Sequence, residues 1–174
     1  MATDRRIVRT QATLQHALVS LIMERGYDAI TVQDICEAAN IGRSTFYAHY
    51  GDKAALKRSG LNHLKASLRV ANPDRFGFIL TLFEHGRDHL QLYRALVGSP
   101  GATTSLESLR RILAELIDDE VRATGLGGIQ RTVTTEFMTG AILAVLTGWL
   151  DEGAVTPVTD MASHCQRLIE KSLD

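Results

Sequence analysis

The chain has 174 residues, of which 45% are hydrophobic, and its 19 Lys and Arg residues nearly balance its 20 Asp and Glu residues. This composition is ordinary for a soluble globular protein made of one domain, or of a small domain joined to a larger one. The net charge of -1 gives no indication of a nucleic-acid partner by itself.

Cysteine usage and apolar patterning narrow the class of protein further. Cys36 and Cys165 both lie in apolar helical patterns, which indicates reduced, buried thiols and excludes a disulfide framework. No Cys or His spacing is typical of a metal site, so neither a metal nor another cofactor is expected. The N-terminus lacks the apolar run of a signal peptide, and the longest apolar stretch, Ala141 to Leu150, is about half of a membrane span. We therefore expect a cytoplasmic protein without a membrane partner.

Every long segment of the chain has the apolar spacing of a helix, and strand alternation is absent. The three prolines fall between these segments, where a helix would end. The sequence therefore predicts an all-α fold of nine helices. Their approximate ranges are 10–25, 31–39, 42–50, 52–70, 76–85, 88–97, 106–123, 129–151 and 158–173.

Charge is distributed unevenly along the chain. Arg5, Arg6 and Arg9 precede the first expected helix and could act as a mobile arm on a DNA backbone or minor groove. The segment 106–120 is acidic and would be kept away from phosphates. The alternative is that the arginines form a disordered tail and that both charged runs are solvated surface, and charge alone leaves this open.

The segment 31–56 contains two short helices joined by a tight turn. Thr31 and Asp34 form a capping box in which Asp replaces the usual Glu, so a helix begins there. Asn40 suits the left-handed conformation of a helix C-terminus. The next helix then begins at Gly42, and Phe46 and Tyr50, four residues apart, point inward.

The second of these helices has polar side chains and an aromatic residue on its other faces. Arg43, Ser44, Thr45, Tyr47 and His49 follow one another within one and a half turns, and few of them suit a core. A short polar helix braced by a preceding helix is typical of a helix-turn-helix, in which the second helix enters the major groove. The pattern therefore favours double-stranded DNA as the partner.

The residues of this segment also resemble a known signature. The run AANIGRSTFYAHYGDKAAL is similar to that of the TetR family of bacterial transcriptional regulators, with two departures, Gly42 where Ser or Thr is frequent and Gly51 where Pro is frequent. The resemblance implies a nine-helix architecture. A helix-turn-helix domain would occupy residues 1–55, and a helical domain for dimerisation and effector binding would occupy residues 56–174.

The resemblance implies roles for individual side chains in contact with DNA. Thr45 and Tyr47 match positions that bond to DNA, and Lys53 matches a phosphate contact beside a helix N-terminus. Arg43 and Ser44 lie where base edges are read. The full expected set is Thr31, Gln33, Arg43, Ser44, Thr45, Tyr47, His49 and Lys53.

The helix 129–151 is apolar nearly all round, so it must be covered on two sides. Gly140, Ala144 and Gly148 recur every four residues and form a ridge that another helix can approach closely. By resemblance, the last two helices pair with those of a second copy, with Cys165 and Leu168 at the interface. The alternative is that the ridge packs only within the monomer.

The family usually has an effector pocket among its middle helices, and aromatic and Met residues there are candidates to line it. For each of them a place in the core is the more common outcome. His85 and His89 could share a ligand or metal, although a flexible surface pair is the simpler interpretation. The candidates are Phe76, Phe83, His89, Tyr93, Phe137, Met138 and Trp149.

The sequence therefore predicts a DNA-binding regulator that represses from a palindromic operator as a homodimer and is released by a small-molecule effector. A regulator controlled without an effector, or by a protein partner, is the alternative, and activation remains open. No nucleophile–base pair, phosphate loop or metal triad indicates an enzyme, so no catalytic residue is assigned.

Overall fold

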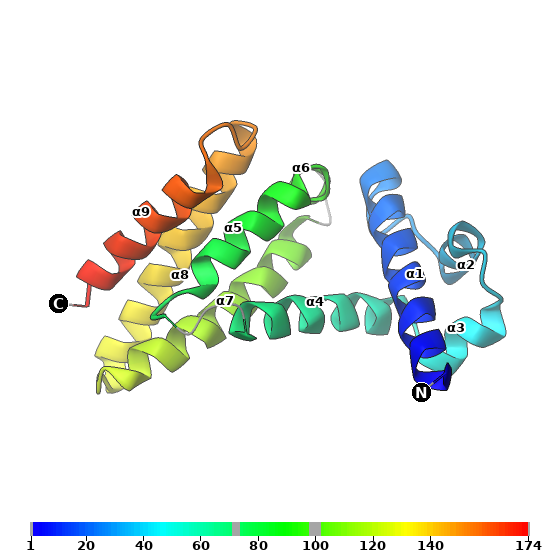
Figure 1. The fold of residues 1–174 in the computed structure, drawn as a ribbon, viewed down its shortest axis with the longest axis horizontal. Helices are drawn as coiled ribbons and strands as arrows, with labels where there is room; N and C mark the ends of the chain where they lie inside the picture. The colour runs from blue at the N-terminus through cyan, green and yellow to red at the C-terminus, as the bar shows by residue number, and fades with distance from the viewer. Residues whose placement is uncertain (1, 71–73, 98–101, 174) are drawn as a thin grey trace.

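The computed structural model describes residues 2–70, 74–97 and 102–173, and all regular structure in these ranges is helical (Figure 1). The all-α class and the number of helices are therefore confirmed. Pro157 immediately precedes the last helix, whereas Pro73 and Pro100 lie outside the described ranges. The helices are α1 (Ala2–Arg25), α2 (Val32–Ala39), α3 (Arg43–His49), α4 (Lys53–Val70), α5 (Phe78–Asp88), α6 (Leu90–Val97), α7 (Ala102–Ala123), α8 (Gly128–Asp151) and α9 (Val158–Lys171).

The buried apolar side chains form two separate clusters, and α4 takes part in both. The first cluster joins α1, α2 and α3 to Leu56 near the start of α4. The second cluster extends from Leu68, near the end of α4, through α5 to α9. We call α1–α3 with the first turn of α4 the head, and the remainder the body. Figure 1 shows α4 running between them, and Leu92 of α6 packs against the head cluster, so α4 and the contact of α1 with α6 together set the position of the head relative to the body.

The first helix is longer than the sequence indicated. It begins at Ala2, so Arg5, Arg6 and Arg9 lie on α1 with exposed side chains, and the expected mobile arm is wrong. The reason is local, because no Gly or Pro interrupts the chain between Ala2 and Arg25 and a helix that has formed at Thr10 extends backward at little cost.

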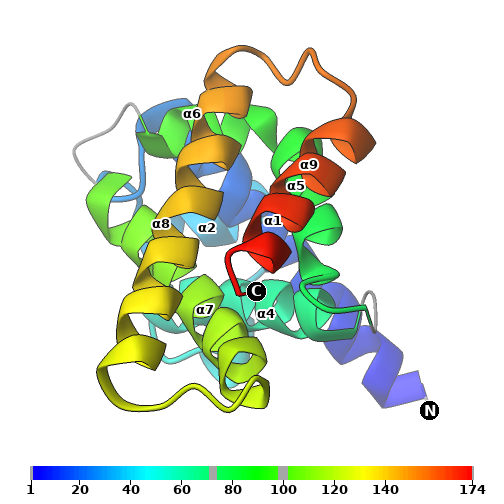
Figure 2. The ribbon, with the colours of Figure 1, turned by 90° about the vertical axis from the view of Figure 1, so that its left-hand side faces the viewer.

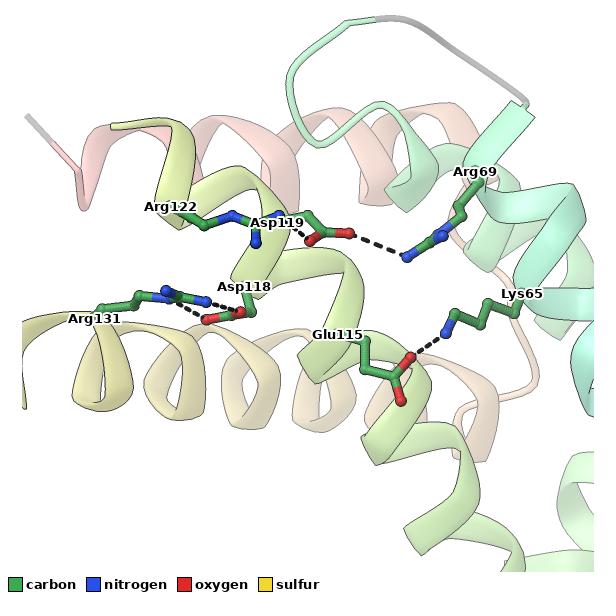
Figure 3. Close-up of polar contacts among 7 residues, drawn as sticks. All are labelled: Lys65, Arg69, Glu115, Asp118, Asp119, Arg122 and Arg131. Atoms are coloured by element: carbon green, nitrogen blue, oxygen red, sulfur yellow. Dashed lines mark hydrogen bonds and ion pairs between the residues drawn. The ribbon is translucent and has the colours of Figure 1, made fainter. Parts of the chain in front are cut away.

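The acidic stretch of α7 is paired within the body. Glu115 accepts from Lys65, and Asp119 accepts from Arg69 at 3.1 Å, so two acids one turn apart on α7 meet two bases one turn apart on α4 (Figure 3). Exposed pairs of this kind each contribute about 1 kcal/mol or less. Together they contribute to the angle at which α4 crosses α7. Since α4 connects the head to the body, this crossing is part of the joint between them.

A further pair joins α7 to α8. Arg131 donates from Nε to the Asp118 carboxylate at 2.6 Å, and a second contact between the same groups makes the pair bidentate (Figure 3). This hydrogen-bonded contact with Arg131 lowers the pKa of Asp118. Arg122 also donates to Asp119 at 2.7 Å, so the ionic contacts run from α4 across α7 to α8.

The helix α8 lies at the end of the molecule opposite to α2 and α3 (Figure 1), and Figure 2 shows it side by side with α9. By length and composition alone α8 is apolar enough to cross a membrane. The sequence analysis did not expect this, because the continuous apolar stretch 141–150 is only about half of a membrane span. Met138, Ile142 and Leu146, however, are fully buried in the body cluster. A core helix of a soluble protein passes the same test, and one face of α8 is part of the body core.

Candidate nucleic-acid interface

The start of α2 is fixed by the capping box that the sequence predicted. The Asp34 amide donates to Thr31 Oγ1 at 3.2 Å, and Asp34 Oδ2 accepts from the Thr31 amide at 2.7 Å. Arg25, at the end of α1, pairs with the same carboxylate at 2.9 Å. The Thr31 hydrogen bonds, with Arg25 as a smaller cause, lower the pKa of Asp34. This carboxylate therefore joins the end of α1 to the start of α2.

The turn between α2 and α3 also has the predicted conformation. Asn40 is left-handed at φ 52° and ψ 47°, and its amide donates to the Glu37 carbonyl at 3.1 Å. The Ile41 amide donates to the Cys36 carbonyl at 2.9 Å. Gly42 is extended and caps α3 without a side chain, as the sequence showed. The first residues of α3 are therefore left open to a partner.

The two faces of α3 differ sharply in polarity. Phe46 is fully buried and Tyr50 nearly so, with ring centres 6.0 Å apart. On the other side, Ser44 and Thr45 are exposed, and Tyr47 is 49% exposed although it is a large aromatic residue. The Arg43 guanidinium lies 5.9 Å from the centre of the Tyr47 ring. This distance is at the outer limit of about 6 Å for a cation–π contact, so Arg43 and Tyr47 lie side by side on the exposed face of α3.

Two of the other expected contacts have partners within the head. Gln33 donates to the Glu37 carboxylate at 2.6 Å. The Thr31 hydroxyl and amide are both used in the capping box, so Thr31 fixes the N-terminus of α2 and has no free donor for a phosphate. His49, at the end of α3, is half-buried, with its ring 6.4 Å from that of Tyr50.

Lys53 has a structural role that the sequence did not indicate. Its ammonium donates to the carbonyls of Tyr27 at 2.9 Å and Ile30 at 2.6 Å, and it lies 4.3 Å from the centre of the Tyr27 ring. These contacts tie the start of α4 to the loop between α1 and α2. Since an ammonium has three donors, a phosphate contact would use the one that remains.

The expected dimer residues divide between surface and core. Gly140, Ala144 and Gly148 are exposed, and a Cβ added at either glycine would meet no atom within 4 Å. Leu168 on α9 is 66% exposed, but Cys165 is only 5% exposed because it lies on the inner face of α9, where burial raises its pKa to about 11. Nothing in the described part of the chain covers the glycine ridge.

Three large apolar side chains extend this exposed surface, and the sequence reading did not place them there. Ile129, Val133 and Phe137 recur every four residues on α8 and are 76%, 58% and 63% exposed. Phe137 was expected in the effector pocket, yet it lies on the outside of the body. Their own i, i+4 spacing, with Gly140 three residues after Phe137 and so on a neighbouring row of the same helix, was the signal that could have identified them. The name α8–α9 surface is used below for the exposed residues Ile129, Val133, Phe137, Gly140, Ala144, Gly148 and Leu168.

A cavity of about 540 Å³ lies at the junction of the head and the body. His89 and Tyr93 from the expected pocket set line it, whereas Phe76, Phe83, Met138 and Trp149 are buried in the body core. Phe83 and Trp149 pack there with ring centres 5.4 Å apart. The sequence reading missed the walls from α1 and α4, which include Gln15, Val19 and Leu64.

A capped α2, a tight left-handed turn and a short α3 with a polar exposed face define a helix-turn-helix DNA-binding protein. Comparison with known families gives the same class. Residues 15–58 match the model of the bacterial regulatory proteins of the tetR family, and residues 75–171 match a transcriptional regulator C-terminal region. The chain belongs to the TetR family of transcriptional regulators.

Individual relatives are distant over most of the chain. The sequence is 46% identical over 54 residues to an uncharacterised helix-turn-helix transcriptional regulator, YxbF of Bacillus subtilis (strain 168), a match over 30% of this chain and 14% of that protein. The chain thus spans a small part of that relative's length.

Two solved structures share the fold. A TetR regulator from Streptococcus agalactiae 2603V has a TM-score of 0.70 at 24% identity, covering 97% of this chain and 98% of its own. The dihydroxyacetone kinase operon activator DhaS has a TM-score of 0.66 at 20% identity, covering 95% of this chain and 97% of its own. At these identities the likeness shows the architecture alone.

Proposed function

We propose that the protein is a homodimeric repressor that binds a palindromic operator and is released from it by a small-molecule effector. One observation carries this proposal: two exposed surfaces lie at opposite ends of the molecule, a polar one on α3 and an apolar one on α8 and α9 (Figure 1). A polar face on a helix-turn-helix suits the major groove, and a large apolar face suits a second copy of the chain.

In this proposal α3 lies in the major groove with Arg43 and Ser44 at the base edges. A bidentate contact from Arg43 to guanine discriminates between bases by about 1–3 kcal/mol. The nearby Tyr47 ring supports that role because a cation–π contact would favour the guanidinium at the exposed start of α3. The remaining contacts, which fix register on the sugar-phosphate backbone, would come from Gln33, Thr45, Tyr47, His49 and the third donor of Lys53.

In the proposed dimer, α8 and α9 pair with their symmetry mates. The open glycine ridge and the exposed Phe137 support this, since an isologous interface brings the same surface of both copies together. Two heads would then read two half-sites, which supplies the contact area that one head lacks.

We further propose that residues 1–55 bind DNA and that residues 56–174 dimerise and bind the effector. The separation of the two apolar clusters along α4 supports this division. A small-molecule effector is favoured over a protein partner because the cavity lies against both clusters and has the volume of a ligand site. Such a regulator works in the cytoplasm, where chromosomal DNA is accessible, and needs neither a membrane nor a cofactor.

Repression is proposed because occupancy of an operator blocks a promoter without any further contact. The described activator DhaS has the same fold, so the direction of control requires its own test. Sequences bound by the purified protein should be selected from random DNA and placed upstream of a reporter. We expect a palindromic site and higher reporter expression when the gene is deleted, whereas an asymmetric site or lower expression would contradict the proposal.

A further inference from the structure

A hollow lies at the surface of the helix-turn-helix, where α2 ends and α3 begins. Its lining includes Gln33 and Glu37 of α2, Gly42 of the turn and Arg43 of α3. Gly42 gives the first amides of α3 no side-chain cap, so this end of α3 is not closed by the protein itself. The acid Glu37 therefore borders the same space as Arg43, the residue proposed to read a base.

The two charges that border this hollow are not paired with each other. Neither Glu37 nor Arg43 takes part in any ion pair among the described residues. Both act on the thiol of Cys36, which lines the same hollow and is 4% exposed. Burial raises the pKa of this thiol, Arg43 opposes the rise and Glu37 adds to it. An unpaired anion and an unpaired cation thus lie on either part of one reading surface.

The fold does not require an acid at position 37. The neighbouring acids fix helix N-termini, since Asp34 closes the capping box and Asp52 accepts from the Ala55 amide at 2.5 Å. Glu37 is exposed, and its partner in the described part of the chain is Gln33, whose amide donates to it at 2.6 Å. An exposed pair one helical turn apart adds little to stability. The charge of Glu37 is therefore available for a partner outside the chain.

An acid on a DNA-reading surface is repelled by most of what it meets. The phosphates carry negative charge, and guanine O6 and N7 and thymine O4 are acceptors, as a carboxylate is. The exocyclic amino groups of the major groove, cytosine N4 and adenine N6, are the donors that a carboxylate can accept from. Glu37 therefore favours a site only where such an amino group faces it.

Gln33 holds the carboxylate without using all of it. Its Nε2 donates to Oε1 of Glu37, and Oε2 takes part in no hydrogen bond among the described residues. A Gln amide has two N–H donors, so the second one is left for the phosphate contact proposed above. The pair can therefore bridge a phosphate and a base edge.

We propose that Glu37 is a specificity-determining residue. Its carboxylate accepts from a cytosine N4 or adenine N6 amino group beside the base that Arg43 reads, and it disfavours every site that lacks such a donor. Glu37 thereby lowers affinity for DNA in general and raises selectivity for the operator. This inference rests on the proposed reading of base edges by α3, which it deepens by adding a second reading charge of opposite sign.

The first test compares affinity for the selected operator with affinity for random-sequence DNA. Both are measured at one fixed salt concentration, because both depend strongly on salt. Glu37→Ala should bind random DNA more tightly, and its ratio of operator to random affinity should fall by about two- to tenfold, the range of one hydrogen bond. The control Glu24→Ala removes the same charge from an exposed position on α1 outside the hollow, and should change both affinities by the same factor. An unchanged ratio for Glu37→Ala would overturn the proposal.

The second test identifies the base. Sequences bound by the wild type and by Glu37→Ala are selected from random DNA and compared position by position. We expect one position in each half-site to lose its preference, for cytosine if N4 is the donor and for adenine if N6 is, while the position that Arg43→Ala relaxes stays selective. Identical selected sequences, or equal relaxation at every position, would refute the role of Glu37.

The wild type separates this inference from the function on which it rests. A wild type that does not prefer its operator to random DNA would show that base reading itself fails. A selective wild type with an equally selective Glu37→Ala would leave base reading intact and reject the role of Glu37 alone.

Discussion

The head and the body each bury one face of a helix and expose the other, but the exposed face is polar in the head and apolar in the body. The head buries one side of α3 around Phe46 and exposes polar side chains such as Arg43 and Thr45. The body buries one side of α8 around Met138 and exposes apolar side chains such as Phe137. Exposed polar side chains are ordinary on a protein surface, whereas a contiguous exposed apolar patch on one helix is typical of an interaction site. The comparison indicates that the two ends of the molecule are built for partners of different chemistry.

The largest effect is expected from reversing the chemistry of the α8–α9 surface. Phe137→Glu places a charge twice in the symmetric interface, and a central interface residue costs about 2 kcal/mol or more when lost. We expect dimerisation to weaken by at least about 100-fold in sedimentation equilibrium, with a parallel loss of operator binding. Val70→Glu is the matched control, since Val70 is 85% exposed but lies at the end of α4. A dimer of unchanged affinity would show that this surface has another purpose.

On the polar surface, Arg43→Ala should relax sequence choice. Loss of a bidentate base contact reduces discrimination between matched and mismatched operators by about 1–3 kcal/mol, or about 5- to 150-fold. Tyr47→Ala should instead weaken binding to all sequences, because it removes a backbone contact as well as the support of Arg43. Gel-shift titrations measure both effects. An equal loss on every site for Arg43→Ala would reject its role in base reading.

The joint between head and α4 gives an intermediate effect on stability. Lys53→Met removes two charge-assisted hydrogen bonds to carbonyls and should lower the free energy of unfolding by about 1.5–3 kcal/mol. Arg58→Met serves as the control, because that side chain is 64% exposed and its nearest acid is 4.0 Å away. Urea unfolding followed by circular dichroism gives both values. If Lys53 served phosphate binding alone, the two variants would unfold alike.

The body should lose stability in acid through one histidine. Because burial lowers the pKa of His85 from 6.5 to about 4, the unfolded chain binds a proton that the folded chain does not between these values. The contribution of His85 to the free energy of unfolding is therefore fully present above pH 6.5. It declines toward pH 4, by at most about 1.4 kcal/mol per pH unit. His89 adds to the shift, and Asp88 opposes it. Urea unfolding of His85→Gln should lack this part of the pH dependence, and identical profiles would refute it.

Local chemistry explains which parts could be predicted from the sequence. The capping box at Thr31, the left-handed Asn40 and the open cap at Gly42 depend only on residues within one helical turn, and all three were confirmed. The arm at Arg5 was wrong because the sequence has no signal that stops a helix there. The inward contacts of Lys53 depend on carbonyls more than 20 positions away, as the separations of 26 and 23 residues show.

The cavity could not be predicted for a related reason. Its walls come from α1, α4, α5, α6 and α7, so only the tertiary fold brings Gln15 and Tyr93 to one space. Phe83 and Trp149 were candidates for the lining, with the core as the more common outcome, and the structure places both in the core. Spacing within one helix indicates which side chains share a face, but not what that face meets.

The central claim is that two copies of the chain pair through α8 and α9 and that each copy contacts DNA bases through α3. It is tested most directly by measuring the mass of the complex with the selected operator while the spacing of its half-sites is varied. We predict two chains per operator, with tight binding only when the half-site centres lie about one helical turn apart, or a multiple of it. One chain per site, or equal affinity for a single half-site, would contradict the account.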